Sequence, residues 1–518
     1  MPSSAETVME LLSAGAPDAP AIGAPGGAPL RYGALRKLVA DTVAALNGAG
    51  IGRGDRVAIV LDNGPHMATA FIAVAAGATA APLNPGYRAE ELEFYLTDLH
   101  ASLLVVEDRD HREDRDGDKT SPAVEVANKL GIPVARLVLE PERGAGAFRL
   151  AYPDTARPSA PKPGLAGPDD IALVLHTSGT TSRPKIVPLS QRNVAASAHN
   201  VRASLALTAT DRALNIMPLF HIHGLIAGTL APLSAGGEVS CTPGFNALKF
   251  FGWMAEVHPT WYTAVPTMHQ AILMRASKNR DVIRQNPLRF IRSSSSALPT
   301  QVIHELEEVF GTAVIEAYGM TEAAHQMASN PLPPATRKPG TVGTAAGPEV
   351  CILDESGHPA APGTTGEIAI RGPNVMAGYE NNPKANGEAF TNGWFRTGDQ
   401  GVMDKDGYVA LTGRLKEIIN RGGEKISPRE VDEVLMDHPA VLQCVTFAMP
   451  HDKLGEEVAA VVVLREGATA TEAELRAFAA RRLADFKVPK KVLFRPEIPK
   501  GATGKLQRIG MAQKLGLG

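Results

Sequence analysis

The sequence contains few cysteines and few aromatic residues, and its charges nearly cancel. Its 518 residues include 3 cysteines and 5% aromatic residues, and the formal net charge is −3. Cys241, Cys351 and Cys444 lie far apart, without a C-x-x-C pair, so we expect neither a disulfide framework nor a cysteine metal site. Because the net charge is small and no long basic block occurs, nucleic acid and anionic membrane are not expected as partners.

Long apolar runs and targeting patterns are also lacking. Nowhere do about eighteen apolar residues follow one another, which argues against a membrane-spanning helix. Residues 1–15 contain no basic segment followed by an apolar one, and the last residues, Gly-Leu-Gly, do not resemble a peroxisomal signal. We therefore predict a cytoplasmic protein. A hydrophobic content of 44% and a charged content of 21% are typical of globular proteins, and the length predicts more than one core.

Predicted strands and helices alternate in the first part of the chain. Apolar residues from Tyr32 to Leu46 recur at helical spacing, and further helices are predicted at 66–76 and 89–99. Between them, short apolar runs at 56–61, 80–83 and 103–106 predict strands. This alternation is typical of βαβ units, so the fold class is α/β with largely parallel sheets.

A polar loop follows the apolar run 171–175, which predicts a buried strand. The loop, HTSGTTSRPK, offers hydroxyl groups, a glycine that permits close backbone approach, and cations: Thr177, Ser178, Gly179, Thr180, Thr181 and Lys185 are the candidate phosphate ligands. The nucleotide P-loop pattern G-x-x-x-x-G-K-[ST] is absent, and no helix pattern opens directly after the lysine. For an isolated Ser/Thr-rich loop, a solvated turn would be the simpler interpretation.

This loop resembles the phosphate loop of the adenylate-forming enzymes, which include acyl-CoA synthetases, luciferases and amino-acid adenylation domains. Members of the family usually carry glycine where this chain has Ser182 and Ile186. We therefore expect a less mobile loop, which leaves the rate of pyrophosphate release open. If the resemblance holds, the cofactors are ATP, Mg2+ and coenzyme A.

Four further motifs occur in the family's order, and two of them concern the nucleotide. The segment VIEAYGMTE at 314–322 resembles the adenine and metal segment, and WFRTGD at 394–399 resembles the ribose motif. The resemblance implies that Glu316, Ala317 and Tyr318 border the adenine, with Tyr318 stacking on it, that Thr321 contacts phosphate and that Glu322 is a magnesium ligand. It also implies that Asp399 binds the ribose hydroxyls and that Arg414 contacts the ribose or phosphate side. For Glu322 alone, an exposed helix-capping carboxylate would be the simpler interpretation.

The segment after Leu411 resembles the family's domain junction. Lys416 takes the position of the hinge, and Lys505, in PKGATGK, takes that of the catalytic lysine, which would act together with Lys185, Thr321 and Glu322. We therefore expect a large N-terminal domain, residues 1–413, built from parallel βαβ layers with a distorted barrel, and a small mobile α+β domain, residues 414–518. Ser427 and Glu430 predict a capping box at the first helix of the small domain.

The acid-binding pocket is predicted from polar residues near strand ends. His221 and His223 could form a metal pair, but no third ligand stands nearby, so we favour a role in lining the pocket. Ser295 and His325 occur at positions where the chain resembles oxalate-CoA ligases, and Lys505 would face the reacting carboxylate. Polar donors suit a small dicarboxylate, whose second carboxylate must be met by a partner. For His325, a hydrogen bond to a loop carbonyl is the alternative.

The sequence therefore predicts an AMP-forming acyl-CoA synthetase for a small carboxylate, with oxalate favoured. A synthetase for another short-chain, aryl or medium-chain acid would share the nucleotide residues and differ in the pocket. An amino-acid adenylation domain would need an acidic residue for the substrate amine, and a nucleotide-binding sensor would bind ATP without turnover. We expect small-molecule partners only, and a monomer or weak homo-oligomer.

Overall fold

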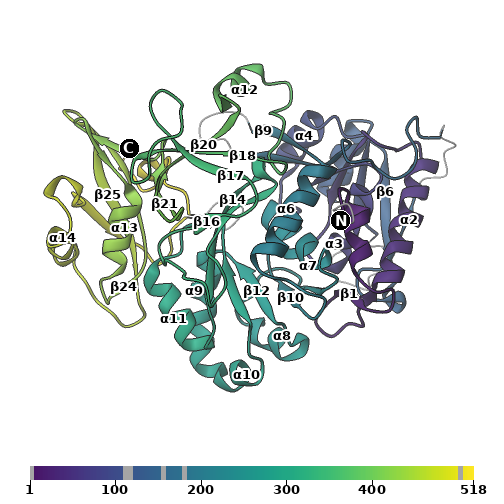
Figure 1. The fold of residues 1–518 in the computed structure, drawn as a ribbon, viewed down its shortest axis with the longest axis horizontal. Helices are drawn as coiled ribbons and strands as arrows, with labels where there is room; N and C mark the ends of the chain where they lie inside the picture. Colours follow the sequence, from purple (N-terminus) through teal and green to yellow (C-terminus); the bar gives the residue numbers. More distant parts are fainter. Residues whose placement is uncertain (1–4, 109–120, 153–158, 178–183, 500–505, 518) are drawn as a thin grey trace.

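The computed structural model describes residues 5–108, 121–152, 159–177, 184–499 and 506–517. In this part of the chain, two large sheets lie next to each other and share a layer of helices. A smaller antiparallel sheet, β17 to β21, adjoins them, and a separate unit at the C-terminal end lies at the left of Figure 1. The predicted α/β fold, with a large N-terminal part and a smaller C-terminal unit, is confirmed.

The first large sheet has seven strands in the order β7-β6-β5-β3-β4-β8-β9. Its strands are β3 (Arg56–Val60), β4 (Thr79–Pro82), β5 (Leu103–Glu107), β6 (Val134–Leu139), β7 (Phe148–Ala151), β8 (Ile171–Thr177) and β9 (Lys185–Ser190). The five central strands run parallel, and β7 and β9 pair antiparallel at the two edges. All of β5 is buried, as expected for a strand that is covered on both faces.

The second large sheet has nine strands in the order β16-β15-β14-β13-β12-β10-β11-β1-β2. Its strands are β1 (Pro20–Gly23), β2 (Leu30–Arg31), β10 (Arg212–Asn215), β11 (Glu238–Cys241), β12 (Trp261–Ala264), β13 (Phe290–Ser293), β14 (Val314–Met320), β15 (His325–Ser329) and β16 (Thr344–Ala345). The strands from β1 to β14 in this order are parallel, whereas β2, β15 and β16 are antiparallel to their neighbours.

Helices α3 (Pro65–Ala75) and α6 (Gln191–Ser204) lie between the two large sheets and contact both. Every residue of α3 after its first is buried, because the helix is apolar all round and is covered on every side. The outer layers are formed by α2 (Tyr32–Gly48), α4 (Ala89–Asp98), α5 (Pro122–Lys129), α8 (Phe250–Val257), α9 (Pro266–Ala276), α10 (Arg280–Gln285) and α11 (Thr300–Phe310). The layered packing leaves the ends of the strands as the natural place for a ligand.

Short helical segments complete the N-terminal part: α1 (Val8–Leu11), η1 (Leu12–Ala14), η2 (Pro141–Arg143), η3 (His223–Leu230), α7 (Ala231–Leu233), η4 (Ser277–Asn279), η5 (Thr321–Ala323) and α12 (Pro383–Ala389). The segment η3 is a π-helix that begins at His223. Asn215 explains the local fold, since its side-chain amide donates hydrogen bonds to Gly224 O and to Thr229 Oγ1, each at 3.1 Å.

A five-stranded antiparallel sheet follows the two large sheets. Its strands are β17 (Glu349–Leu353), β18 (Thr365–Arg371), β19 (Phe390–Thr391), β20 (Trp394–Met403) and β21 (Val409–Arg414). Strand β20 pairs with β18, β19 and β21, and the register sets Asp399 opposite Arg414.

The C-terminal unit contains a second five-stranded sheet, in which only β26 is parallel to its neighbour. Its elements are β22 (Ile419–Arg421), β23 (Glu424–Ile426), α13 (Pro428–Met436), β24 (Val441–His451), β25 (Gly455–Leu464), α14 (Glu472–Ala480), η6 (Asp485–Lys487), β26 (Lys491–Phe494) and α15 (Met511–Lys514). The predicted capping box of α13 is half formed. Ser427 Oγ accepts from Glu430 N, but the Glu430 carboxylate pairs with Lys487 at 2.7 Å instead of bonding back to the cap.

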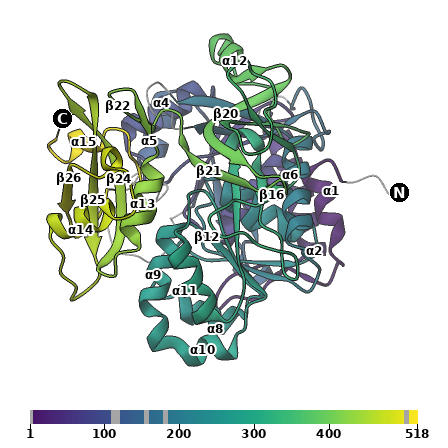
Figure 2. The same cartoon turned by 60° about the vertical axis from the view of Figure 1, so that its left-hand side comes forward.

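The C-terminal unit packs against α9 and α11 through polar contacts. Gln443 Nε2 donates to Gln270 Oε1 at 2.9 Å, and Arg465 pairs with Glu305 at 3.1 Å. Figure 2 shows the unit beside these two helices. A polar interface of this kind is compatible with the domain movement that the resemblance implies. Among the described residues, no helix combines the length and apolarity that crossing a membrane requires.

Candidate active site

The candidate site lies where the central strands of the nine-stranded sheet end. Strands β12, β13 and β14 are parallel neighbours, and their register places Thr263 beside Arg292 and Ser293 beside Glu316. In open α/β sheets, ligands bind at the carboxyl ends of the strands. Ser295 follows β13, and Tyr318 and Glu322 lie at the end of β14 and just beyond it, so two separate stretches of sequence meet at one edge.

Asp399 is the centre of the predicted nucleotide side of the site. The Tyr318 hydroxyl donates a short hydrogen bond to Asp399 Oδ2, and Arg414 Nε lies 3.2 Å from Oδ1. Burial and the Asp399 charge raise the pKa of the Tyr318 hydroxyl far above its ordinary value, so this hydroxyl remains a donor. The same carboxylate raises the pKa of Arg414. A carboxylate has lone pairs left after two such contacts, and those could accept from a vicinal diol.

Glu322 and Lys185 come together through Tyr379, which sequence reasoning missed. The Tyr379 hydroxyl donates to Glu322 Oε1 at 2.8 Å, and Lys185 Nζ lies 4.3 Å from the centre of the Tyr379 ring. Burial raises the pKa of Glu322, while the Tyr379 hydrogen bond and the positive charges of Arg414 and Lys185 counteract that rise. The tyrosine therefore links the predicted phosphate lysine to the predicted metal carboxylate.

The donor set around Glu322 fits magnesium. Mg2+ prefers hard oxygen ligands, and it often takes only one or two carboxylates from protein and completes its shell with phosphate and water. Glu322 is 6% exposed and supplies one carboxylate. Within the described ranges, no group of three or more His, Cys, Asp or Glu residues could hold a metal. The residues thus suit an ion shared with a bound phosphate, not one enclosed by protein alone.

The two ends of the predicted phosphate loop are paired with each other. Thr177, the last residue of β8, lies opposite Lys185, the first residue of β9, in the antiparallel ladder. The predicted phosphate ligands Ser178, Gly179, Thr180 and Thr181 lie outside the described residues, as does Lys505. A strand follows Lys185, in agreement with the absence of a helix pattern there, and α6 begins six residues later, at Gln191.

The predicted acid-binding residues His223, Ser295 and His325 gather around a residue that sequence reasoning missed, Arg292. His223 Nδ1 lies 3.0 Å from Ser295 Oγ, and the His223 and His325 rings stack with their centres 4.9 Å apart. Arg292 Nη1 donates to His223 Nε2 at 3.3 Å, and Nη2 donates to His325 Nε2 at 3.1 Å. An arginine inside an otherwise apolar strand was the signal in the sequence, whereas no local pattern marks Tyr379.

The other predicted residues lie near these groups. His221 is partly exposed, and its Nδ1 accepts from His223 N at 3.4 Å. Ala317 and Glu316 are buried on β14, and burial raises the pKa of Glu316 to about 8 while Gly340 N donates to its carboxyl group at 3.1 Å. Thr321 begins η5, where its carbonyl accepts from Ala324 N at 2.9 Å.

The hairpin between β14 and β15 needs glycine at position 319. A Cβ atom there would lie 1.7 Å from His325 O, closer than any side chain permits. Glycine therefore lets the two strands approach, and it sets His325 beside Met320 in the ladder. The close approach brings the acyl-side histidine next to the segment that carries Thr321 and Glu322.

The predicted hinge is tied to the C-terminal tail. Lys416 lies in the turn between β21 and β22, and the next residue, Glu417, pairs with Arg508 at 3.4 Å. Arg508 also pairs with Asp432 on α13 at 2.7 Å. These contacts attach the tail three residues after Lys505 to the junction between the two predicted domains.

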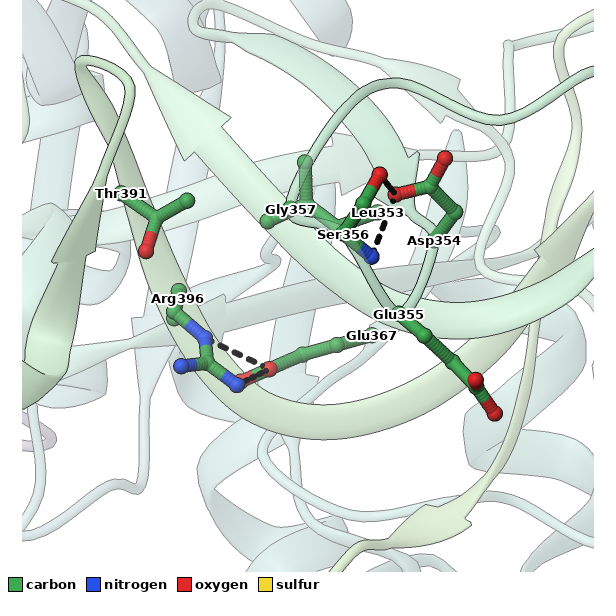
Figure 3. Close-up of a pocket in the computed structure, with 8 residues that line it drawn as sticks. All are labelled: Leu353, Asp354, Glu355, Ser356, Gly357, Glu367, Thr391 and Arg396. Carbon is green, nitrogen blue, oxygen red and sulfur yellow. Dashed lines mark hydrogen bonds and ion pairs between the residues drawn. The ribbon is translucent and has the colours of Figure 1, made fainter.

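A separate cavity of about 150 Å³ lies on the five-stranded sheet β17 to β21. Figure 3 shows Arg396 paired with Glu367, and Ser356 bonded to Asp354. Within the cavity, the charges of Arg396 and Glu367 thus neutralise each other. It shares no residue with the candidate site, and we assign it no part in the chemistry.

Comparisons with known proteins agree with this arrangement. The family described as AMP-binding enzyme matches residues 11–380, and the AMP-binding enzyme C-terminal domain matches residues 430–505. The chain is 47% identical to a protein of Arabidopsis thaliana named oxalate–CoA ligase, over 96% of both chains. It is 41% identical to a Saccharomyces cerevisiae protein of the same name, over 89% of this chain and 87% of the relative. Among solved structures, ATP-bound MatB from Rhodopseudomonas palustris superimposes with a TM-score of 0.85, at 30% identity, over 97% of both chains.

Proposed function

The chain belongs to the AMP-binding enzyme family and is a CoA ligase, and from this premise we propose that it converts oxalate to its CoA thioester. In the first step, an oxalate oxygen attacks the α-phosphorus of ATP, which gives oxalyl-adenylate and releases pyrophosphate. In the second step, the thiol of coenzyme A attacks the activated carbonyl, which gives oxalyl-CoA, AMP and a proton. The observation that carries the choice of acid is the donor-rich wall formed by His223, Ser295 and His325.

The acyl-side wall suits a small acid with a second charged end. The buried side chains of His223 and His325, with the partly buried Ser295, offer nitrogen and hydroxyl groups where an enzyme for long or aryl acids would need apolar residues. A carboxylate moved out of water is stable only if hydrogen-bond donors or a cation meet it. The names of the two most similar relatives reported above support the same acid.

In the proposed first step, the chain's own residues position the reactants and neutralise charge. Asp399 would hold the ribose, and Lys185 would face the β- and γ-phosphates. Glu322 would hold Mg2+, which neutralises phosphate charge when bound. Lys505 would stabilise the charge that develops where the carboxylate attacks. Phosphoryl-transfer enzymes act mainly by such positioning and electrostatic stabilisation.

The second step requires a different neighbour for the carbonyl. The thiol must approach the carbonyl carbon next to which Lys505 would lie in the first step. The small domain would therefore turn about Lys416 and move Lys505 away from that carbon. The polar interface with α9 and α11 could break at modest cost, because exposed ion pairs contribute only about 0–1 kcal/mol each. ATP and coenzyme A are therefore the proposed cosubstrates.

A panel of acids tests the proposal. CoA-dependent release of AMP is expected to be fastest with oxalate, slower with malonate and acetate, and near background with hexanoate and coumarate. A preference for hexanoate or coumarate would contradict the choice of acid and leave the ligase assignment intact. Tight ATP binding without AMP release for any acid would instead favour the sensor.

Changing Tyr379 to Phe is expected to shift the acidic side of the pH–activity profile to higher pH. Burial already raises the pKa of Glu322, and the Tyr379 hydrogen bond opposes that rise, so its loss raises the pKa further. The ionised carboxylate is the form that attracts Mg2+. As the pH is lowered, Tyr379→Phe should therefore lose activity at a higher pH than the wild type does. A lost charge-assisted hydrogen bond costs about 1.5–3 kcal/mol, so the Mg2+ concentration for half-maximal rate should rise at least about tenfold.

Tyr408 provides a matched control for Tyr379. Lys338 Nζ lies 4.2 Å from the centre of the Tyr408 ring, which repeats the lysine-over-tyrosine arrangement away from the site. Tyr408→Phe should leave both the pH profile and the Mg2+ requirement unchanged. Equal behaviour of the two variants would argue against a link between Tyr379 and the metal.

A further inference from the structure

Arg292 is a buried cation whose contacts, within the described part of the chain, are all neutral. The residue is 0% exposed in the middle of the nine-stranded sheet. Its guanidinium donates to Thr263 Oγ1 at 3.3 Å, to His223 Nε2 at 3.3 Å, to His325 Nε2 at 3.1 Å and to Gln326 Oε1 at 3.2 Å. No described carboxylate pairs with it. A buried charge without a counter-charge is costly, so its presence calls for an explanation.

The guanidinium determines which nitrogen of His223 carries the proton. Arginine has donors only, so the His223 Nε2 that faces Arg292 Nη1 must be an acceptor. Thr263 Oγ1 lies 2.6 Å from the same nitrogen, and its hydroxyl donates to it while its oxygen accepts from Arg292. The proton of the neutral ring is therefore on Nδ1, which donates to Ser295 Oγ at 3.0 Å. With its oxygen occupied in this way, the Ser295 hydroxyl can donate its own proton to a ligand.

The same reasoning applies to His325. Its Nε2 accepts from Arg292 Nη2 at 3.1 Å, so the proton of the neutral ring is on Nδ1. The His223 and His325 rings stack at an angle of 18°, which keeps both imidazoles on the same guanidinium. Burial lowers the pKa of Arg292 to about 9, which still leaves it charged at neutral pH.

The backbone adopts unfavourable conformations at three positions near Arg292. Ser295, Ala324 and His325 all have positive φ, at 72°, 48° and 109°, a region that L-residues rarely occupy. Such conformations cost of the order of 1–3 kcal/mol each and cluster at ligand-binding sites. The strain falls on the two loops that present Ser295 and His325, and it is independent of the charge argument.

We propose that Arg292 is a positioning residue that determines specificity for an acid with a second carboxylate. It orients both histidines and Ser295 as donors, and it supplies the positive charge that balances the buried second carboxylate without touching it. This inference rests on the proposed function, because it assigns a cause to the preference for oxalate. A monocarboxylate would leave the charge of Arg292 unbalanced and would bind less well for that reason.

The test compares oxalate with oxamate, in which an amide of nearly the same shape replaces the second carboxylate. In the wild type, kcat/KM for adenylate formation should favour oxalate. In Arg292→Met the oxalate to oxamate ratio should fall by about 30-fold or more, chiefly through KM for oxalate, with KM for ATP unchanged. Arg292→Lys restores the charge with fewer fixed donors, so it should regain part of the ratio.

Arg289 provides the matched control. It lies three residues earlier, just before β13, and pairs with Asp211 at 2.9 Å, so Arg289→Met also removes an arginine close to Arg292 in sequence. That variant should keep the wild-type ratio even if it is less stable. An unchanged ratio in folded Arg292→Met, or an equal fall in both variants, would overturn the inference. A wild type that ignores oxalate would instead refute the proposed function.

A measurement on the wild type decides the case if Arg292→Met does not fold, or if oxalate is not a substrate. Nitrogen-15 NMR of histidine-labelled protein at neutral pH distinguishes the two neutral tautomers, and His223→Gln and His325→Gln assign the signals. Both rings should carry the proton on Nδ1 and lack it on Nε2. A proton on Nε2 of either ring would overturn the inference, because the guanidinium could not then donate to that nitrogen.

Discussion

Replacing Lys505 by alanine is expected to slow adenylate formation by about three orders of magnitude and to leave thioester formation nearly intact. In the proposed reaction, this lysine meets the charge that develops when the carboxylate attacks the α-phosphorus, and removal of one such group costs about 10²–10³ in rate. The second step takes place after the lysine has been withdrawn, so it should not need it. Pyrophosphate exchange into ATP measures the first step, and CoA acylation from supplied acyl-adenylate measures the second.

Lys514 is the control for this prediction. It lies on α15, nine residues further along the same tail, and its Nζ donates to Gln507 Oε1 at 3.2 Å. Lys514→Ala should keep both rates within a few-fold of the wild type. Loss of both half-reactions in Lys505→Ala would indicate a structural role for the lysine. An unimpaired first step would remove it from the mechanism.

Replacing Asp399 by alanine is expected to raise KM for ATP by two orders of magnitude or more and to change KM for the acid little. The carboxylate is 5% exposed and is held by Tyr318 and Arg414, so its orientation is fixed. Hydrogen bonds to a charged group contribute about 1.5–3 kcal/mol each, and two of them to the ribose diol account for a change of this size. Asp399→Asn keeps the shape and loses the charge, so its KM should lie between those of the wild type and the alanine variant.

The nucleotide can be changed as well as the protein. With 2′,3′-dideoxy-ATP, which has no diol, the KM of the wild type should rise close to that of Asp399→Ala. The difference between the two enzymes should then shrink to a few-fold. If Asp399→Ala raises KM by the same factor for ATP and for 2′,3′-dideoxy-ATP, Asp399 acts by holding Tyr318 and Arg414, and the ribose assignment is wrong.

Much of the fold could be predicted because its signals are local. The apolar runs at 56–61 and 103–106 became β3 and β5, and the helical spacing after Tyr32 became α2, since periodic burial depends on neighbours in sequence. The resemblance to the adenylate-forming enzymes is confirmed by the comparisons. The boundary at residue 413, the hinge at Lys416 and the roles of the site residues stay predictions.

Other features could not be read from local patterns. The helix beginning at His223 depends on Asn215, which lies on a preceding strand and bonds to Gly224 and Thr229. The capping box of α13 is incomplete because Lys487, 57 residues later, takes the Glu430 carboxylate. Both the helix at His223 and the incomplete capping box of α13 therefore depend on a residue outside the local sequence pattern.

The sequence by itself determined the order of strands and helices, the hydroxyl-rich loop and the residues that are predicted to bind phosphate, metal and ribose. Only the tertiary structure decided which of them meet. Tyr379 contacts both Lys185 and Glu322, and Arg292 donates hydrogen bonds to both His223 and His325, although these residues are far apart in the chain. Hydrogen bonds and charges act over a few ångströms in space, and distance along the chain does not reveal them.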